Sequence, residues 1–203
     1  MFEKFLGNCK RPNGIYGTII ANMMNKGHAP LSKWAFEVCP LKNGEKVLDV
    51  GCGGGGNMVR IMKQCSESQV YGIDYSQTSV ECSRKNTEKF SDRCSVSYGD
   101  AMFLPYDDNT FDRVVSFESI YFWTDPMKGI QEIMRVLKKG GKIVLASEMT
   151  NPEKGKFWTD HCEGMTIYNS QQLAEFLKQA GFVGVKTHTA HKVWCVVEGD
   201  KKC

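Results

Sequence analysis

A glycine-rich stretch at residues 47–57 has the residue types and the spacing of a ligand-binding turn. The apolar run 47–50 is followed by glycines at positions 51, 53, 54, 55 and 56, and then by a helical pattern of apolar residues. Glycine lets the backbone approach a ligand closely and adopt φ values that other residues avoid. The helix that follows directs its unpaired N–H groups back at the turn. The pattern predicts a buried strand, a tight turn and a helix, with a small ligand over the turn.

Two classes of nucleoside ligand are compatible with these glycines. The spacing Gly51-x-Gly53-x-x-Gly56 satisfies the dinucleotide fingerprint, and Asp49-x-Gly51-x-Gly53-x-Gly55 satisfies the glycine motif of enzymes that use S-adenosylmethionine (SAM). Asp49 favours SAM, because a pyrophosphate at the helix N-terminus would meet this carboxylate as a like charge. SAM has no phosphate and carries an ammonium and a sulfonium. A glycine-rich turn without a ligand is the remaining alternative.

A second acid lies at the end of the next apolar run. Asp74 closes the run 69–74, 21 residues after Gly53. In an open parallel sheet this strand lies beside the first, so we expect its terminal carboxylate to accept both ribose hydroxyls. The alternative is that Asp74 only stabilises the N-terminus of the helix expected over residues 76–90.

A third acid, Asp100, follows the strand expected over residues 94–98. Its carboxylate is suited to accept from the exocyclic amine of adenine while Met102 packs on the ring; the alternative is a surface turn capped by an aspartate. The residues expected to bind the cofactor are Asp49, Gly51, Cys52, Gly53, Gly55, Asn57, Asp74, Tyr75, Asp100, Ala101, Met102 and Phe117.

Methyl transfer from a sulfonium demands little acid–base chemistry, because the methyl group is already activated. Orientation of the reactants contributes about 7 to 11 kcal/mol, more than the roughly 10²- to 10⁴-fold of a general base. A base is needed only for a hydroxyl or a carbon acid. By residue type the candidates are His28, His161 and Tyr121, with Glu118 as a further one. The alternative for each histidine is a polar surface residue.

The elements that position these residues alternate between strands and helices. Further strands are expected at 111–117 and 142–147, with a helix from Pro126 to Gly140 between them. This alternation predicts a parallel, doubly wound sheet with right-handed crossovers. A helix ending near Gly181 precedes two runs that suit a hairpin, 182–188 and 193–197.

Two segments outside this pattern are expected to build the methyl-acceptor pocket. Residues 1–40 read as short helices that either cover one edge of the core or act as a lid, and residues 150–169 read as irregular. We expect residues 10–34 and 155–168 to close over the methyl group. The side chains that suggest this are Tyr16, His28, Trp34, Trp158, His161 and Tyr168. Residues 121–123 either wall this pocket or pack in the core.

The composition is that of one globular domain, residues 1–203, with 1–40 as the helical lid and 41–203 as the core. The formal charge is +3 and the basic residues come at most in pairs, so nucleic acid is not an expected partner. The chain has neither a membrane-spanning run nor a signal-peptide pattern, which indicates a cytoplasmic protein. We expect a monomer or a homodimer. Nine scattered cysteines without a C-x-x-C pair predict neither a disulfide framework nor a metal site.

Residues 40–200 resemble the class I SAM-dependent methyltransferases, especially the small-molecule branch of the ubiquinone- and menaquinone-biosynthesis type. The motifs are VLDVGCGGG at 47–55, GID at 72–74, GDA at 99–101 with LP at 104–105, and LKKGG at 137–141. The resemblance implies a Rossmann-like α/β fold with helices on both faces of a seven-stranded sheet, in the order 3-2-1-4-5-7-6 with strand seven antiparallel. It also implies SAM as cofactor and S-adenosylhomocysteine as product.

The resemblance leaves the methyl acceptor open. The Pro-Pro-Tyr signature of amino-methylating enzymes is missing after strand four, where this chain has residues 116–119 in the order Ser-Phe-Glu-Ser. We therefore expect a small-molecule acceptor. The alternatives are a methyltransferase acting on RNA or protein, a nicotinamide-dependent oxidoreductase, and a SAM-binding protein without catalysis.

Overall fold

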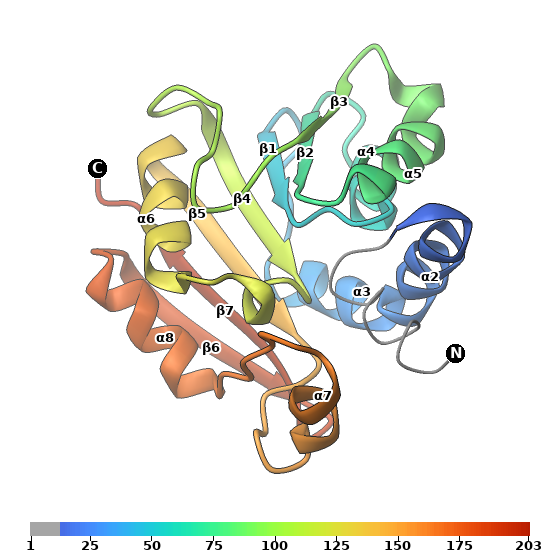
Figure 1. Cartoon of the computed structure of the whole chain (residues 1–203). Helices are drawn as coiled ribbons and strands as arrows, with labels where there is room; N and C mark the ends of the chain where they lie inside the picture. Colours follow the sequence, from blue (N-terminus) through green and yellow to red (C-terminus); the bar gives the residue numbers. More distant parts are fainter. Residues whose placement is uncertain (1–12) are drawn as a thin grey trace.

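A seven-stranded sheet organises the chain in the computed structural model, which describes residues 13–203 (Figure 1). The strands are β1 (Lys46–Val50), β2 (Gln69–Asp74), β3 (Cys94–Tyr98), β4 (Phe111–Phe117), β5 (Leu137–Ser147), β6 (Val183–Ala190) and β7 (Trp194–Asp200). Their order is β3-β2-β1-β4-β5-β7-β6. Neighbours from β3 to β5 pair in parallel, whereas β7 pairs antiparallel with both β5 and β6. The expected order and direction of the strands are confirmed.

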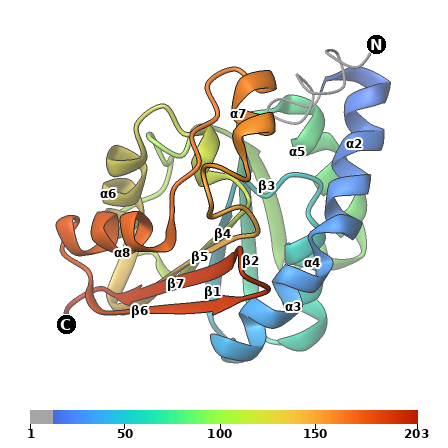
Figure 2. The same ribbon diagram turned by 90° about the horizontal axis from the view of Figure 1, so that it is seen from below.

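Helices cover both faces of this sheet. They are α2 (Gly14–Gly27), α3 (Ala29–Val38), α4 (Gly56–Gln64), α5 (Gln77–Thr87), α6 (Pro126–Val136), α7 (Lys156–His161) and α8 (Ser170–Gln179), with short 3₁₀ turns η1 (Glu88–Phe90) and η2 (Ile120–Phe122). Helices α6 and α8 lie on one flank and α2 to α5 on the other, as both views show (Figures 1 and 2). No helix among the described residues is long and apolar enough to cross a membrane.

The two faces of the sheet carry separate hydrophobic cores. Leu48 and Val50 belong to the core beneath α6 and α8, whereas Val47, which precedes them in β1, belongs to the core beneath α3 and α4. Successive side chains of a strand point to opposite faces, so a strand covered on both sides must be apolar at nearly every position. Asp49 lies in this run and is also buried, which marks it as an exception that needs a functional reason.

Two expected boundaries are wrong. Helix α6 ends at Val136 rather than at Gly140, and β5 begins at Leu137 rather than at residue 142. Leu137 pairs with Phe111 of β4 before the register shifts, so strand pairing overrides the helical pattern there. The expectation that the segment 150–169 is irregular is wrong in part, because this segment contains the helix α7.

The N-terminal helices are fastened to the glycine-rich turn. Asn25 of α2 accepts a hydrogen bond from the backbone N–H of Gly56 (3.2 Å), and its carbonyl accepts one from the guanidinium of Arg60 (3.0 Å). Ser32 of α3 donates to the side-chain oxygen of Asn57 (2.6 Å). These contacts place α2 and α3 over the start of α4. Residues 1–12 of the expected lid lie outside the described part of the chain.

Candidate active site

The glycine-rich turn passes so close to other elements that two of its positions require glycine. Gly51 has φ +74°, and a Cβ there would lie 2.4 Å from the Oγ of Ser119. Gly55 has φ +78°, and its Cβ would lie 2.4 Å from the Oγ of Ser83. Both positions combine a left-handed backbone with a neighbour that fills the space of a side chain. The turn therefore packs tightly against two other parts of the chain, which are the segment after β4 and the helix α5.

A cavity of about 450 Å³, called here the strand-end cavity, opens beside this turn at the carboxyl ends of β1 to β4. This is where ligands bind in open α/β sheets. Its lining includes six of the residues expected to bind the cofactor: Gly51, Asp74, Tyr75, Asp100, Ala101 and Met102. It also includes Gly99 of the GDA motif, the candidate base Glu118, and Phe122 and Trp123 from the aromatic run 121–123. Sequence reasoning did not select the remaining lining residues, which are Met24, Val50, Ile73, Ser119 and Thr124.

Asp74 connects the glycine-rich turn to the end of β2. One carboxylate oxygen accepts from the N–H of Gly53 (2.9 Å) and the other from the N–H of Ser76 (2.9 Å). Burial raises the pKa of Asp74, and these two backbone donors oppose that rise. Each oxygen keeps a second lone pair for a ligand hydroxyl. The contact with Ser76, the N-cap of α5, shows that the helix-stabilising role is compatible with ligand binding.

Asp49 is the most unusual side chain of the site. It is 1% exposed, and neither carboxylate oxygen has a hydrogen-bond partner among the described residues. Burial, and secondarily the charge of Asp74, raise the pKa of Asp49 to about 7, against the attraction of Arg60. Buried polar atoms without a partner are rare and costly. An ammonium group would satisfy these two oxygens, which is the group that SAM offers and that a dinucleotide lacks.

The loop after β3 brings the two residues expected to contact adenine to the wall of the strand-end cavity. Asp100 accepts a hydrogen bond from the N–H of Met102 (3.0 Å), and both residues line the strand-end cavity. The sulfur of Met102 lies 3.2 Å from the hydroxyl of Thr124 and 3.3 Å from the N–H of Asp125. These two contacts hold the thioether in place, so that it can form one wall of a slot for a flat ring.

Six of the residues expected to bind the cofactor lie outside the lining of the strand-end cavity. One is Asp49, and the other five are Cys52, Gly53, Gly55, Asn57 and Phe117. Cys52, Asn57 and Phe117 line a small cavity of about 50 Å³ on the other side of the turn, and burial raises the pKa of the Cys52 thiol well above its ordinary value. Gly53 and Gly55 shape the turn through their positive φ angles. Whether these five contact a cofactor stays a prediction.

A second cavity, called here the apolar cavity, adjoins the first and measures about 320 Å³. Met24, Glu118 and Phe122 line both cavities. The rest of its lining consists of Ile20, Met23, Gly27, His28, Tyr121, Glu148, Met149, Trp158, Cys162 and Met165. Residues 20–28 and 158–165 thus meet at one cavity, and the closure of the segments 10–34 and 155–168 over a methyl group stays a prediction.

Most of the side chains that suggested this pocket lie elsewhere. Only His28 and Trp158 line it. Tyr16 is 78% exposed, and His161 stacks on the ring of Phe157 and makes a hydrogen bond with its carbonyl (2.7 Å). The other two pack against rings of neighbouring elements, Trp34 against Trp194 and Tyr168 against Phe176. Side chains with an apolar body and a polar tip also pack at the edges of a core. Their residue types and positions in the sequence were therefore not sufficient to identify the lining of the cavity.

Glu118 lies where the two cavities join. It has φ +53°, its N–H donates to the carbonyl of Ala146 (3.0 Å), and its carboxylate accepts from the hydroxyl of Tyr121 and from the N–H of Glu148 (2.5 Å). Burial raises the pKa of Glu118 to about 7, and the hydrogen bonds from Tyr121, Glu148 and Ser147 oppose the rise. A left-handed conformation at a non-glycine residue is strained and often marks a functional site.

Two further titratable groups face Glu118. His28 Nδ1 or Nε2, a carboxylate oxygen of Glu118 and one of Glu148 all lie within 4.8 Å of one another. Burial lowers the pKa of His28 and raises that of Glu148, while the attraction between the two opposes both shifts. Glu148 was missed in the sequence, because it follows β5 without any motif around it. Tyr121, a catalytic candidate, is buried and contacts Glu118.

Other polar clusters of the described residues are already satisfied. Cys39, His188 and Glu198 bring possible metal ligands within 4.8 Å of one another, but Glu198 is paired with Lys142 (2.5 Å) and with His188 (3.0 Å).

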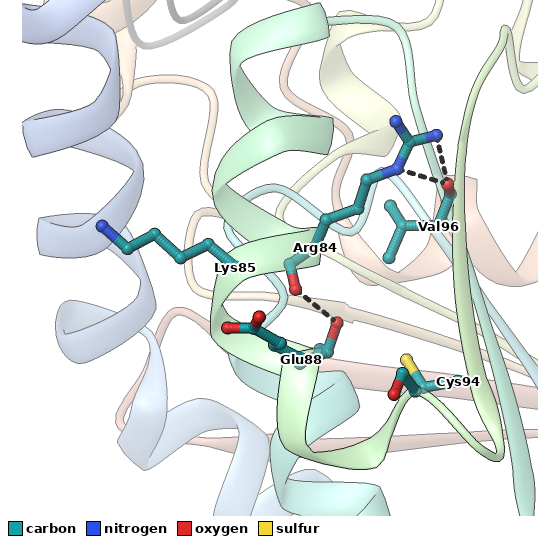
Figure 3. A pocket seen from close by; sticks show the side chains of 7 residues that line it. Arg84, Lys85, Glu88, Cys94 and Val96 are labelled. Atoms are coloured by element: carbon teal, nitrogen blue, oxygen red, sulfur yellow. Dashed lines mark hydrogen bonds between the residues drawn. The ribbon is translucent and has the colours of Figure 1, made fainter.

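An open hollow of about 430 Å³ lies between α5 and β3 (Figure 3). Its Arg84 donates two hydrogen bonds to the carbonyl of Val96 (3.0 and 2.8 Å), so this guanidinium fastens α5 to the sheet.

Comparison with known proteins agrees with this geometry. The family described as "Methyltransferase domain" matches residues 48–145, which contain the glycine-rich turn, Asp74 and Asp100. A SAM-dependent methyltransferase from Aquifex aeolicus has the same fold, with a TM-score of 0.76 at 20% identity over 91% of this chain and 98% of that one. Residues 48–145 therefore belong to the methyltransferase-domain family, and the fold is that of the class I SAM-dependent methyltransferases. SAM is therefore its cofactor, and the unpaired oxygens of Asp49 fit its ammonium.

The curated relatives of this chain include methyltransferases that are named after small molecules. A 2-methyl-6-phytyl-1,4-hydroquinone methyltransferase from Oryza sativa subsp. japonica is 34% identical over 85% of this chain and 52% of its own length. The norajmaline N-methyltransferase of Rauvolfia serpentina is 32% identical over 68% of this chain and 51% of its own length. The chain thus spans about half the length of these relatives.

Proposed function

We propose that this chain transfers the methyl group of SAM to a small molecule bound in the apolar cavity. The observation that carries the proposal is the shared wall of the two cavities, because Met24, Glu118 and Phe122 line both. A methyl acceptor in the second cavity would lie directly against a cofactor in the first. This displacement mainly requires that the reacting atoms lie close together and in line.

Asp49 and residues that line the strand-end cavity would hold and orient the cofactor, which supplies a methyl group activated by its sulfonium. Asp49 would accept from the ammonium, Asp74 from the ribose hydroxyls and Asp100 from the exocyclic amine of adenine. Each hydrogen bond to a charged group contributes roughly 1.5 to 3 kcal/mol. Three such contacts at separated points fix both the position and the direction of the methyl group.

The size and lining of the apolar cavity favour a small methyl acceptor. Its volume of about 320 Å³ is that of a small-molecule site, and most of its lining is apolar. The names of the relatives refer to a hydroquinone and an alkaloid, which agrees with this reading. RNA or protein as methyl acceptor is the second candidate, and a nicotinamide-dependent reaction is disfavoured because a pyrophosphate would approach Asp49 as a like charge.

Calorimetric titration with SAM, S-adenosylhomocysteine and NAD tests the cofactor. We expect SAM and its product to bind and NAD not to bind. Asp49→Asn should weaken SAM about tenfold or more, as expected from the loss of one charged hydrogen bond. The matched control is Asp92→Asn, which changes an exposed aspartate of a turn. Comparable affinity for NAD, or unchanged affinity for SAM in Asp49→Asn, would contradict the assignment.

Transfer of a radiolabelled methyl group from SAM separates the classes of methyl acceptor. We expect label in a metabolite extract and none in total RNA or in denatured protein. Label found only in RNA or protein would overturn the small-molecule assignment while leaving SAM binding intact. The cytoplasmic location and the monomeric or dimeric state stay predictions, which cell fractionation and light scattering can test.

A further inference from the structure

The polar groups of the apolar cavity are confined to a single cluster and carry one sign of charge. Among the thirteen residues that line it, His28, Glu118 and Glu148 have titratable groups that lie within 4.8 Å of one another. Tyr121 also lines the cavity, and its hydroxyl already donates to Glu118; the indole N–H of Trp158 is a further, uncharged donor in the lining. No lysine or arginine belongs to the lining. The cavity therefore offers apolar walls and one acidic point.

This arrangement discriminates between possible occupants by charge. A phenolate, thiolate or carboxylate would meet two glutamates as like charges in a site that is partly shielded from water, where such repulsion is strong. An ammonium would be attracted by both glutamates and could donate hydrogen bonds to them, which are the strong, charge-assisted kind. The methionines and aromatic rings around the cluster would hold an apolar body, including by contacts between Trp158 and a cation.

We propose that the methyl acceptor of this enzyme is an apolar amine, whose nitrogen is held by Glu118 and Glu148 and whose proton is taken by His28. This inference rests on the proposed methyl transfer and names the class of its substrate. It assigns Glu118 and His28 as catalytic residues and Glu148 as a binding residue. Glu118 has the central place because it lines both cavities and so lies between the amine and the methyl group.

The chemical step balances with these groups alone. The amine arrives as an ammonium and transfers one proton to the imidazole of His28, which frees the nitrogen lone pair. That pair forms the new bond to the methyl carbon, the carbon–sulfur bond breaks, and its electron pair stays on sulfur. The positive charge moves from sulfur to nitrogen, where the two glutamates stabilise it. A hydroxyl acceptor would end as a neutral ether and would gain nothing from the glutamates after the transfer.

His28 is suited to take the proton. It lies at the junction of α2 and α3 and faces Glu148 and Glu118, and burial lowers its pKa, which favours the neutral imidazole. The charge of Arg60, from α4, also lowers the pKa of His28, whereas Glu148 raises it and so stabilises the imidazolium once formed. The carboxylate of Glu148 thus offsets part of the basicity that burial removes from His28.

Matched probes with one variable group test the substrate class. We would compare phenylbutylamine, phenylbutanol and phenylbutanoate by calorimetry on the enzyme saturated with S-adenosylhomocysteine, and by methyl transfer from labelled SAM. We expect the amine to bind about tenfold or more tighter than the alcohol and the carboxylate not to bind, as expected for a charged hydrogen bond. Tighter binding or faster methylation of the alcohol or the carboxylate would overturn the proposal.

Substitutions distinguish the roles of the three residues. Glu148→Gln should weaken the amine about tenfold and leave the affinity of the alcohol within about twofold, since only the ammonium depends on the charge. Glu118→Gln should do the same and also lower kcat. The matched control is Glu153→Gln, an exposed glutamate near α7 that lines neither cavity. Equal losses for amine and alcohol would show a merely structural role.

His28→Gln should lower kcat for phenylbutylamine and leave KM nearly unchanged. Butylaniline, which is largely deprotonated in solution, should recover most of the lost kcat because it brings no proton to remove. Failure of this recovery would overturn the role of His28. If SAM itself fails to bind, the proposed function fails; if SAM binds and the amine does not, only this inference fails.

Discussion

The hydroxyl of Tyr121 donates a hydrogen bond to the carboxylate of Glu118, three residues earlier in the turn after β4. The contact opposes the rise in the pKa of Glu118 that burial causes. Two backbone hydrogen bonds hold this pair of residues in place. The carbonyl of Tyr121 accepts from the N–H of Thr166 (2.9 Å), and the N–H of Glu118 donates to the carbonyl of Ala146 (3.0 Å). Glu118 is thereby kept ionised closer to neutral pH than its burial alone would allow.

Tyr121→Phe should therefore raise the pKa of Glu118 further. At neutral pH more of this carboxyl would be protonated, and phenylbutylamine would bind more weakly. The loss should shrink as the pH is raised, because Glu118 then ionises in the variant as well. Amine affinity measured across pH 6 to 9 checks this. A loss that is independent of pH would mean that Tyr121 acts through packing only.

Two buried carboxyls should make the cofactor-free protein less stable as the pH rises. Burial raises the pKa of Asp49 and of Glu118 to about 7 in the folded protein, well above their values in the unfolded chain. The folded state thus binds more protons, so their contribution to stability is complete below about pH 4 and is lost as the pH rises towards about 7. Thermal melts from pH 4 to pH 8 should show this decline.

Asp49→Asn should flatten that decline, because asparagine does not titrate. Saturation with SAM should flatten it in the unsubstituted protein, because the ammonium of the cofactor stabilises the ionised form of Asp49. Asp92→Asn is the control that should leave the curve unchanged. Parallel curves for Asp49→Asn and the unsubstituted protein would contradict the burial of an unpaired carboxyl at this position.

Gly55→Ala should destabilise the fold more than Gly44→Ala. Both glycines have a left-handed backbone, with φ +78° and +84°, so the strain of an L side chain is similar at the two positions. A Cβ at Gly55 would collide with Ser83, whereas nothing lies within 4 Å of one at Gly44. Strain alone costs roughly 1 to 3 kcal/mol. Chemical denaturation measures the difference, and equal losses would mean that the turn can move away from α5.

Asn25→Ala should loosen the N-terminal helix from the glycine-rich turn and leave the sheet folded. The variant loses the hydrogen bond from Gly56, which at a partly buried site is worth about 1 kcal/mol. Because Met24 and His28 flank this residue and line the apolar cavity, methyl transfer should fall more than SAM affinity does. Lys26→Ala, an exposed change on the same helix, is the control. An unchanged ratio of transfer to SAM affinity would contradict the lid role of α2.

The sequence by itself determined the sheet, the glycine-rich turn and the acids at the strand ends. These features are local, since an apolar run, a break into glycines and a terminal acid are read over fewer than about ten residues. Once a parallel sheet is recognised, its connectivity brings the ends of β1, β2 and β3 to one edge. The convergence of Asp74 and Asp100 on one cavity could therefore be predicted without coordinates.

Only the tertiary structure decided the second half of the site. His28, Glu118 and Glu148 come from three segments separated by up to 120 residues, and nothing in their local sequence distinguishes them from His161, which lies on the surface. Their meeting depends on the pairing of β4 with β5, on the left-handed backbone of Glu118 and on the seating of α2 over the glycine-rich turn. Side-chain contacts across such distances follow from packing, which local patterns do not encode.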